Sequence, residues 1–237
     1  MTPRLNRLRR NRRSSSWADM RGSIYHDVVA DPQSREVIQL LPRDYSAAGG
    51  VLGRAFSDDP LWLALMSDPQ TRQARLRQMF TGLAKATAAA NGVAETTPGL
   101  EAVALWLAPG KELGWWSMVR SGMSMPRFAM TLPARDRRRM MAVLRQGDQR
   151  RRELMPRPHW YLEAIGVEPE HQGAGVGSAL VGAGLRRADL DKTPVYLETE
   201  TERNVAFYEH LGFNVVEQTV ATGLDLPLWL MIRPYRL

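Results

Sequence analysis

The stretch from residue 160 to residue 188 most constrains how this chain can fold. Residues 159–167 form an aromatic and aliphatic run typical of a strand, and Pro169, which cannot donate to a sheet, follows it. A run of small residues occupies 172–178, and from Val176 onward apolar residues recur at near-helical spacing. The sequence therefore predicts a strand, a glycine loop and a helix in immediate succession.

A glycine loop of this kind has a chemical use. Small residues let the backbone approach a ligand closely, and the N–H groups of the first helical turn bind an anion such as a pyrophosphate. The dinucleotide motif does not fit, because counting from Gly175 puts Leu180 where its third glycine belongs, and no P-loop lysine follows. The alternative is that the glycines only make a tight turn between strand and helix.

Two ordered motifs resemble one enzyme superfamily. The spacing Gln-x-x-Gly-x-Gly at Gln172, Gly175 and Gly177 resembles the acetyl-CoA pyrophosphate loop of the GNAT superfamily of N-acetyltransferases. Further along the chain, Asn204 and Tyr208 stand four residues apart ahead of a Gly-Phe pair, which resembles the second signature of the same superfamily. Two signatures in the expected order are stronger than either one alone.

Two shorter stretches resemble one branch of that superfamily. Leu197-Glu198-Thr199, which precedes the second signature, and residues 55–60, which end in Asp-Asp-Pro, look most like the puromycin N-acetyltransferase branch. The resemblance implies acetyl-CoA as co-substrate and direct attack by an amine in a ternary complex. It implies a cofactor site formed by Ile165, Gly166, Val167, Gln172, Gly173, Ala174, Gly175, Val176, Gly177, Ser178, Asn204 and Tyr208.

Acetyl transfer from a thioester needs a neutral amine, a donor to the oxyanion and a proton for the leaving thiolate. We predict Tyr208 as the general acid, because a phenol of pKa about 10 is protonated at neutral pH. Glu163 and Glu198, on neighbouring predicted strands, are the candidate bases. Period-two alternation predicts that Glu163 shares a strand face with Tyr161, Ile165 and Val167. Alternatively, both carboxylates only attract a cationic substrate.

The predicted fold is of the α/β (α+β) class. About seven strands in a mixed, mostly antiparallel sheet, with helices on both faces, are expected over residues 37–237. Residues 111–156, rich in Met, Trp and Arg, predict a helical insertion in two halves, broken near Pro126 and Pro133. This insertion could close over a bulky apolar acceptor, cover the sheet, or lie on a membrane surface.

Composition narrows the class of protein. The formal charge of +7 comes from a basic arm over residues 1–36, expected to be flexible, and from the insertion. No apolar stretch reaches the ~18 residues of a membrane span, and there is no cysteine, so a cytoplasmic protein without disulfides is expected. No cluster of residues has metal-ligand spacing, so no metal is expected.

The function that fits best is acetyl transfer to a primary amine of a small molecule. One alternative is a protein N-acetyltransferase, which would need an open groove for its substrate. Another is a non-catalytic module that responds to acyl-CoA and uses its arginines to contact nucleic acid or membrane. Arginine runs without aromatic platforms are more often solvated faces, so neither partner is expected, and the chain is expected to be a monomer or a homodimer.

Overall fold

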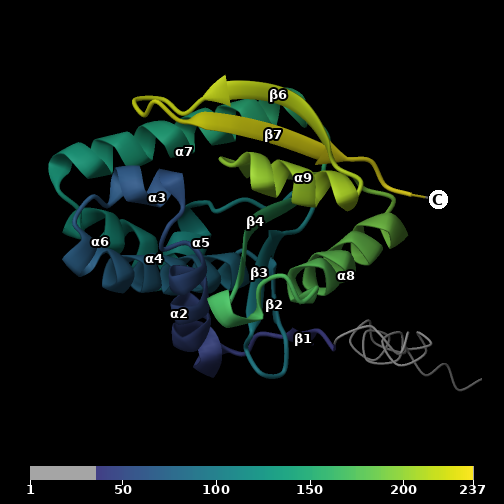
Figure 1. The fold of residues 1–237 in the computed structure, drawn as a ribbon, viewed down its shortest axis with the longest axis horizontal. Helices are drawn as coiled ribbons and strands as arrows, with labels where there is room; N and C mark the ends of the chain where they lie inside the picture. The colour runs from purple at the N-terminus through teal and green to yellow at the C-terminus, as the bar shows by residue number, and fades with distance from the viewer. Residues whose placement is uncertain (1–35, 237) are drawn as a thin grey trace, which may run out of the picture. The chain divides into compact units, whose positions relative to one another are not determined.

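The computed structural model describes residues 36–236, and these residues form a single seven-stranded sheet with helices on both faces (Figure 1). The predicted fold class is therefore confirmed. The predicted basic arm lies outside the described residues, apart from Glu36. The strands are β1 (Ile38–Gln39), β2 (Val93–Thr96), β3 (Ala102–Leu107), β4 (Trp160–Val167), β5 (Val195–Thr199), β6 (Asn214–Val220) and β7 (Pro227–Arg233).

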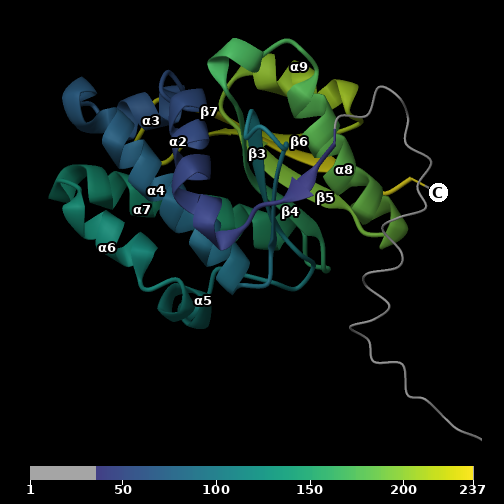
Figure 2. The same cartoon turned by 90° about the horizontal axis from the view of Figure 1, so that it is seen from below.

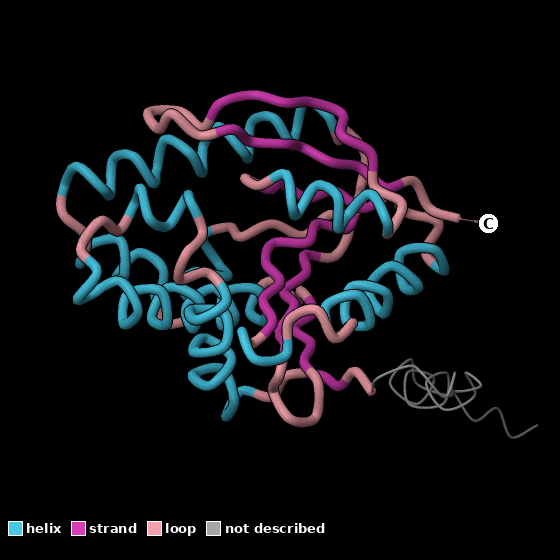
Figure 3. Tube along the Cα trace, in the orientation of Figure 1, coloured by secondary structure: helices cyan, strands magenta, loops and turns pink. Residues whose placement is uncertain are grey.

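The sheet has the strand order β1-β2-β3-β4-β5-β7-β6. Every pairing is antiparallel except that of β4 with β5. β6 and β7 form the long hairpin drawn in magenta at the top of Figure 3, and β7 lies between β6 and β5 in the sheet. In this sheet β4 and β5 are therefore the one pair of neighbouring strands that run in the same direction.

Helices fill the connections between these strands. They begin where the sequence offers helix-starting residues: Asp59 and Asp68 accept hydrogen bonds from first-turn N–H groups, and a proline follows each of them. The helices are the short 3-10 helices η1 (Pro42–Asp44) and η2 (Pro169–His171), and α2 (Tyr45–Ala55), α3 (Pro60–Leu65), α4 (Pro69–Ala89), α5 (Trp115–Arg120), α6 (Ser124–Thr131), α7 (Ala134–Leu154), α8 (Val176–Leu190) and α9 (Glu202–His210).

The two faces of the sheet carry separate cores. Leu52 of α2 and Leu76 and Phe80 of α4 are buried with side chains of β2 and β3. On the opposite face, Leu180 of α8 and Tyr208 of α9 are buried with side chains of β3, β4, β5 and β7. Figure 2 shows α2 and α4 on one side of the strands and α8 and α9 on the other. Burial of these two apolar helix faces is the main force that holds the layers together.

The insertion differs from its prediction. It contains the three helices α5, α6 and α7, and the first break falls at residues 121–123, where Met123 has a φ of +56°. Pro126 does not break a helix, because it lies in the first turn of α6, where no intrahelical N–H bond is lost. Trp115 and Trp116 of α5 are 68% and 72% exposed.

The longest helix of the insertion, α7, runs beside the last hairpin. Its Gln146 side chain donates to the Val220 carbonyl at 2.9 Å, and Arg150 pairs with Glu217 of β6. These contacts hold α7 beside β6, the edge strand of the sheet (Figure 1). No helix of residues 36–236 is long and apolar enough to cross a membrane.

Candidate active site

The opening between β4 and β5 is the centre of the candidate site. The two strands pair only at Trp160 with Val195 and at Tyr161 with Tyr196, and beyond these pairs they are not hydrogen-bonded to each other. The following residues of β4 therefore keep backbone groups on that side for another partner.

Register tells which backbone groups face the opening. The Glu168 N–H donates to the Glu101 carbonyl across the β3 side at 2.8 Å. Because successive residues of a strand point their backbone groups to opposite sides, Gly166 faces β3, while Ile165 and Val167 face β5. The Gln172 side chain already donates to the Val167 carbonyl at 3.2 Å. The cofactor role of Ile165 and Val167 stays a prediction.

The predicted glycine loop forms a cradle at the start of α8. Gly173 and Gly175 have φ values of +76° and +79°, a region that glycine enters without strain, and open space surrounds the position of a Cβ on either residue. Gly175 is the N-cap of α8, and no side chain caps this helix. At Gly177 a Cβ would lie 3.2 Å from Val167 Cγ2. Exposed small residues at an uncapped helix start fit a diphosphate group.

Gly166 has a packing role that the resemblance did not indicate. A Cβ at this position would lie 2.8 Å from Ala55 Cβ and 2.9 Å from Leu52 Cδ2, both on α2. Because Gly166 faces β3 and packs against α2, its absent side chain brings the helix close to the sheet and does not by itself point to a ligand.

Tyr208 lies in α9 at the edge of the core beneath the opening. Its ring contacts Phe207 and Phe213 edge-on, with centroids 5.1 Å and 5.7 Å away. Burial, and then the charge of Glu200, raise the pKa of the Tyr208 phenol well above its ordinary value of 10. The hydroxyl therefore stays protonated throughout the neutral range. The helix begins at Glu202, because the Thr201 side chain accepts from the Asn204 N–H and caps it.

The predicted face of Glu163 is wrong in part. The register of β3 against β4 shifts at Leu105 and Trp106, which pair with Ala164 and Leu162, so Glu163 is an extra residue in β4. The bulge turns Glu163 toward α4, on the same face as Tyr161, whereas Ile165 and Val167 pack against the core on the α8 side. Period-two alternation fails here because it assumes an unbroken ladder.

Glu163 has the environment of a poised base. The Thr87 hydroxyl of α4 donates to its Oε2 atom at 2.7 Å. Burial raises the pKa of the Glu163 carboxyl to about 7, although the Thr87 hydrogen bond and the charge of Arg151 oppose this rise. A carboxyl with such a pKa is partly ionised at neutral pH and can accept a proton there.

Glu198 lies on the neighbouring strand β5 and is held from two sides. The Tyr196 hydroxyl donates to its Oε1 atom at 2.8 Å. On the other side, a Cβ on Gly147 of α7 would lie 2.8 Å from Glu198 Oε2, so the helix approaches the carboxylate closely only because residue 147 is glycine. Burial raises the pKa of Glu198 as well. The insertion thus forms one wall of the candidate site.

A buried arginine lies beside both carboxylates. Arg151 of α7 is 8% exposed, and its guanidinium carbon lies 5.1 Å from the centroid of the Tyr161 ring. It pairs with Asp148 at 2.8 Å, and its charge lowers the pKa of both Glu163 and Glu198. No residue pattern separates Arg151 from the solvated arginines around it, since burial within a run of like residues depends on tertiary packing.

A third carboxylate of the site, Glu200, was not predicted from the sequence. Glu200 follows β5, and burial together with the charges of Asp59 and Glu198 raises its pKa to about 8. Asp59, the N-cap of α3, is also half-buried, and burial raises its pKa. Glu200 could have been predicted from its spacing to Glu198, because residues two apart share a strand face. The structure thus gathers Glu163, Glu198, Glu200 and Asp59 near the opening, with Glu200 the carboxylate whose charge acts on Tyr208.

Comparisons with known proteins show which proteins this chain resembles. Residues 140–213 match the model of the acetyltransferase (GNAT) family. A mycothiol acetyltransferase of Propionibacterium freudenreichii is 39% identical over 67 residues, which are 27% of this chain and 22% of that protein. A mycothiol acetyltransferase of Nocardiopsis dassonvillei is 46% identical over 52 residues, which are 21% of this chain and 16% of that protein. The match therefore spans about a fifth of the length of these curated relatives.

Solved structures share the fold over most of the chain. A Corynebacterium glutamicum protein described as histone acetyltransferase HPA2 and related acetyltransferase is 26% identical, with a TM-score of 0.62 over 86% of this chain and 98% of that one. A Drosophila melanogaster polyamine N-acetyltransferase shares the fold at 14% identity, with a TM-score of 0.57 over 84% of this chain and 99% of that one. Residues 140–213 thus match the acetyltransferase (GNAT) family, and most of the chain shares its fold with solved acetyltransferases.

Proposed function

We propose that this protein transfers the acetyl group of acetyl-CoA to a primary amine of a small cationic molecule. The observation that carries the proposal is the gathering of half-buried carboxylates beside the opening between β4 and β5, next to an uncapped glycine loop. Buried carboxylates with raised pKa values mark functional sites more often than structural ones. Bound acetyl-CoA supplies the reactive thioester.

The chain offers separate positions for the two ends of the co-substrate. N–H groups at the start of α8 hold the diphosphate, with the glycine loop letting the backbone come close. Backbone groups of Ile165 and Val167 pair with the amide-bearing arm as a neighbouring strand would, which brings the acyl end toward Tyr208. Holding both substrates in one orientation supplies much of the rate enhancement.

Glu163 acts as the general base. An alkylammonium group reaches the site protonated, and the amine must lose a proton before it can attack the acetyl carbon. With a pKa of about 7, the Glu163 carboxyl is ionised often enough at neutral pH to take that proton, directly or through water. Glu198, held by Tyr196 and close to Gly147, attracts the ammonium group and fixes its position.

Tyr208 completes the transfer as proton donor. When the thioester bond breaks, the leaving sulfur gains negative charge, which a nearby hydroxyl stabilises by donating its proton. Burial keeps this phenol protonated. Asn204, one helical turn earlier on α9, is positioned to bond to the co-substrate arm.

The acceptor class follows from the charge of the site. Four carboxyl groups against one buried arginine favour an acceptor that carries a second cationic group besides the reacting amine. The polyamine enzyme of Drosophila melanogaster shares only the fold, so the proposal does not rest on it. The narrower resemblance to the puromycin N-acetyltransferase branch stays a prediction, and the curated relatives over this segment are named mycothiol acetyltransferases.

The decisive experiment is a free-thiol release assay with acetyl-CoA against a panel of amines. The panel contains monoamines, diamines, polyamines, aminoglycosides, aminonucleosides and a peptide with a free N-terminus. We expect release with acceptors that carry two or more cationic groups, and its loss in Glu163→Gln but not in the exposed control Glu209→Gln. Absence of thiol release with every amine, together with no heat on titration with acetyl-CoA, would refute the proposal.

A further inference from the structure

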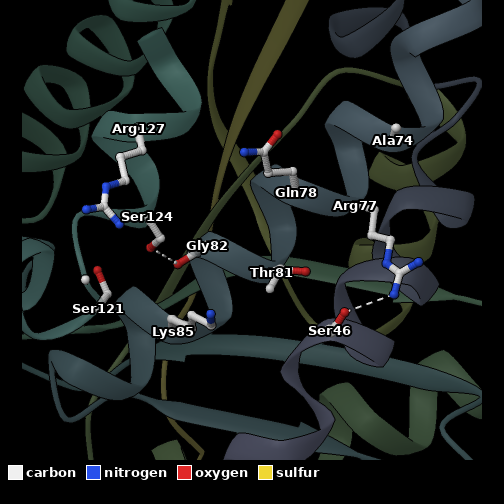
Figure 4. Close-up of a pocket in the computed structure, with 11 residues that line it drawn as sticks. Ser46, Ala74, Arg77, Gln78, Thr81, Gly82, Lys85, Ser121, Ser124 and Arg127 are labelled. Atoms are coloured by element: carbon white, nitrogen blue, oxygen red, sulfur yellow. Dashed lines mark hydrogen bonds between the residues drawn. The ribbon is translucent and has the colours of Figure 1, made fainter. Parts of the chain in front are cut away.

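A hollow of about 510 Å³ lies along α4 and is lined by residues of α2, α4 and α6, and it has a different character from the candidate active site (Figure 4). Three cations line it, Arg77 and Lys85 of α4 and Arg127 of α6. Among the described residues, its lining includes no carboxylate and no member of β4, β5, the glycine loop or α9. It is therefore a separate feature of the molecule.

Two glycines fix the walls of this hollow. A Cβ on Gly49 would lie 2.1 Å from Thr81 Oγ1, so α2 packs directly against α4. A Cβ on Gly82 would lie 3.2 Å from Met125 Sδ, and the Ser124 hydroxyl donates to the Gly82 carbonyl at 3.3 Å, so the first turn of α6 also packs directly against α4. These contacts set α2 and α6 on opposite sides of α4 before any ligand arrives.

The three cations have no carboxylate partner in residues 36–236 within ion-pair distance. The sequence explains this, because α4 carries four basic residues and no acidic one between Pro69 and Ala89. Figure 4 shows Arg127 and Arg77 at opposite ends of the lining, with Thr81 and Lys85 of α4 between them. Like charges gathered around one hollow repel one another, and a bound anion would relieve this repulsion.

One cation is held toward the hollow by a hydroxyl. The Arg77 guanidinium donates to the Ser46 hydroxyl oxygen at 2.9 Å. Since that oxygen accepts a hydrogen bond, the proton of the Ser46 hydroxyl can be donated to a ligand. Guanidinium forks and an ammonium point charge together suit phosphate oxygens, the arginines by paired hydrogen bonds and the lysine by charge.

We propose that this hollow binds the phosphate or diphosphate group of a small molecule other than the acetyl-CoA held at the glycine loop. Its volume of about 510 Å³ falls within the range of small-molecule sites. A concave site lined by cations on two helices favours an anion that carries several charges. A free phosphorylated compound and a phospholipid headgroup share this chemistry.

The test is calorimetric titration of the full chain with pyrophosphate in the presence of saturating CoA, so that the glycine loop does not contribute. We expect binding that weakens about fivefold in Lys85→Ala and again in Arg127→Ala, as expected for the loss of one nearby charge. Arg138→Ala, which removes an exposed cation of α7 that does not line the hollow, should change the affinity less than twofold. Flotation with anionic phospholipid vesicles, using the same variants, separates a headgroup from a soluble ligand.

Several outcomes would overturn the proposal. One is the absence of heat at millimolar pyrophosphate with no variant-sensitive vesicle binding, and another is equal weakening by Arg138→Ala, which would mean attraction to the general surface charge. Retained thermal unfolding temperatures exclude misfolding, since both substituted side chains are exposed. The result does not depend on acetyl transfer: if CoA failed to bind, the proposed function would fall, while the effects of the hollow variants on pyrophosphate would still decide this site.

Discussion

Replacing Glu163 by glutamine should make the folded protein more stable at alkaline pH while removing its activity. Burial raises the pKa of this carboxyl from 4.5 to about 7, so the folded chain holds the proton more tightly than the unfolded chain does. The resulting stabilisation is fully present below pH 4.5 and is lost as pH rises through about 7. Above that pH the protein carries an ionised carboxylate in a partly dehydrated position.

The size of the effect follows from the same pKa values. A rise from 4.5 to about 7, at about 1.4 kcal/mol for each pKa unit, corresponds to about 3 kcal/mol as an upper value. Glutamine cannot ionise, yet its amide oxygen can still accept from the Thr87 hydroxyl. The variant should therefore match the parent near pH 4.5 and exceed its unfolding free energy by up to about 3 kcal/mol near pH 8.5.

The assay is urea unfolding of parent and variant at both pH values, with Glu209→Gln on the exposed surface of α9 as the control. The control should shift by less than about 0.5 kcal/mol between the two pH values. A stability difference between parent and Glu163→Gln that is the same at both pH values would refute the reasoning. So would a variant that keeps the parent's pH–rate profile for acetyl transfer, since the base would then lie elsewhere.

Three other substitutions test separate parts of the site. Tyr208→Phe should keep acetyl-CoA affinity, measured by calorimetry, and lower turnover by about tenfold or more, because the proton donor is lost. Gly147→Ala should raise the KM for a cationic acceptor in steady-state assays, because its Cβ would lie 2.8 Å from the Glu198 carboxylate. Gly177→Ala should raise the Kd for acetyl-CoA in the same calorimeter, because its Cβ would lie 3.2 Å from Val167 and displace the start of α8.

One control variant and three contradicting outcomes go with these predictions. Gly182→Ala on α8 meets only the flexible end of Arg186 at 3.5 Å, so it should leave both constants unchanged and stabilise the helix by about 0.5–1 kcal/mol. Unchanged turnover in Tyr208→Phe would remove that residue from the mechanism. An unchanged acceptor KM in Gly147→Ala would mean that α7 does not border the acceptor, and unchanged acetyl-CoA affinity in Gly177→Ala would argue against the diphosphate cradle.

Much of the fold could be predicted because local signals were strong. The strand, glycine loop and helix predicted over residues 160–188 are β4, the loop that contains Gly173 and Gly175, and α8. The break predicted at Pro126 failed because the effect of a proline depends on where a helix begins. That start is set by the left-handed turn at Met123, which its residue type does not favour.

For the candidate site, the sequence predicts which segments contribute to it but not how their side chains are oriented. The positions of the glycine loop and of Tyr208 could be predicted from motif spacing. The direction of the Glu163 side chain, in contrast, depends on a β-bulge that no residue of the sequence indicates. Arg151 and Gly147 act through the packing of α7 against β5, a contact between segments about fifty residues apart in the chain. The roles of the predicted catalytic and cofactor-binding residues stay predictions until the variants are measured.

The position of β7 between β5 and β6 has a consequence for biosynthesis. Until residues 227–233 have emerged from the ribosome, β5 has one bare edge and β6 has no partner in the sheet. Unpaired edges of this kind recruit other strands, so nascent chains stalled before β7 would be exposed to aggregation. Neighbouring nascent chains on one polysome would therefore expose unpaired strand edges, until the β6–β7 hairpin forms on each chain and pairs with β5.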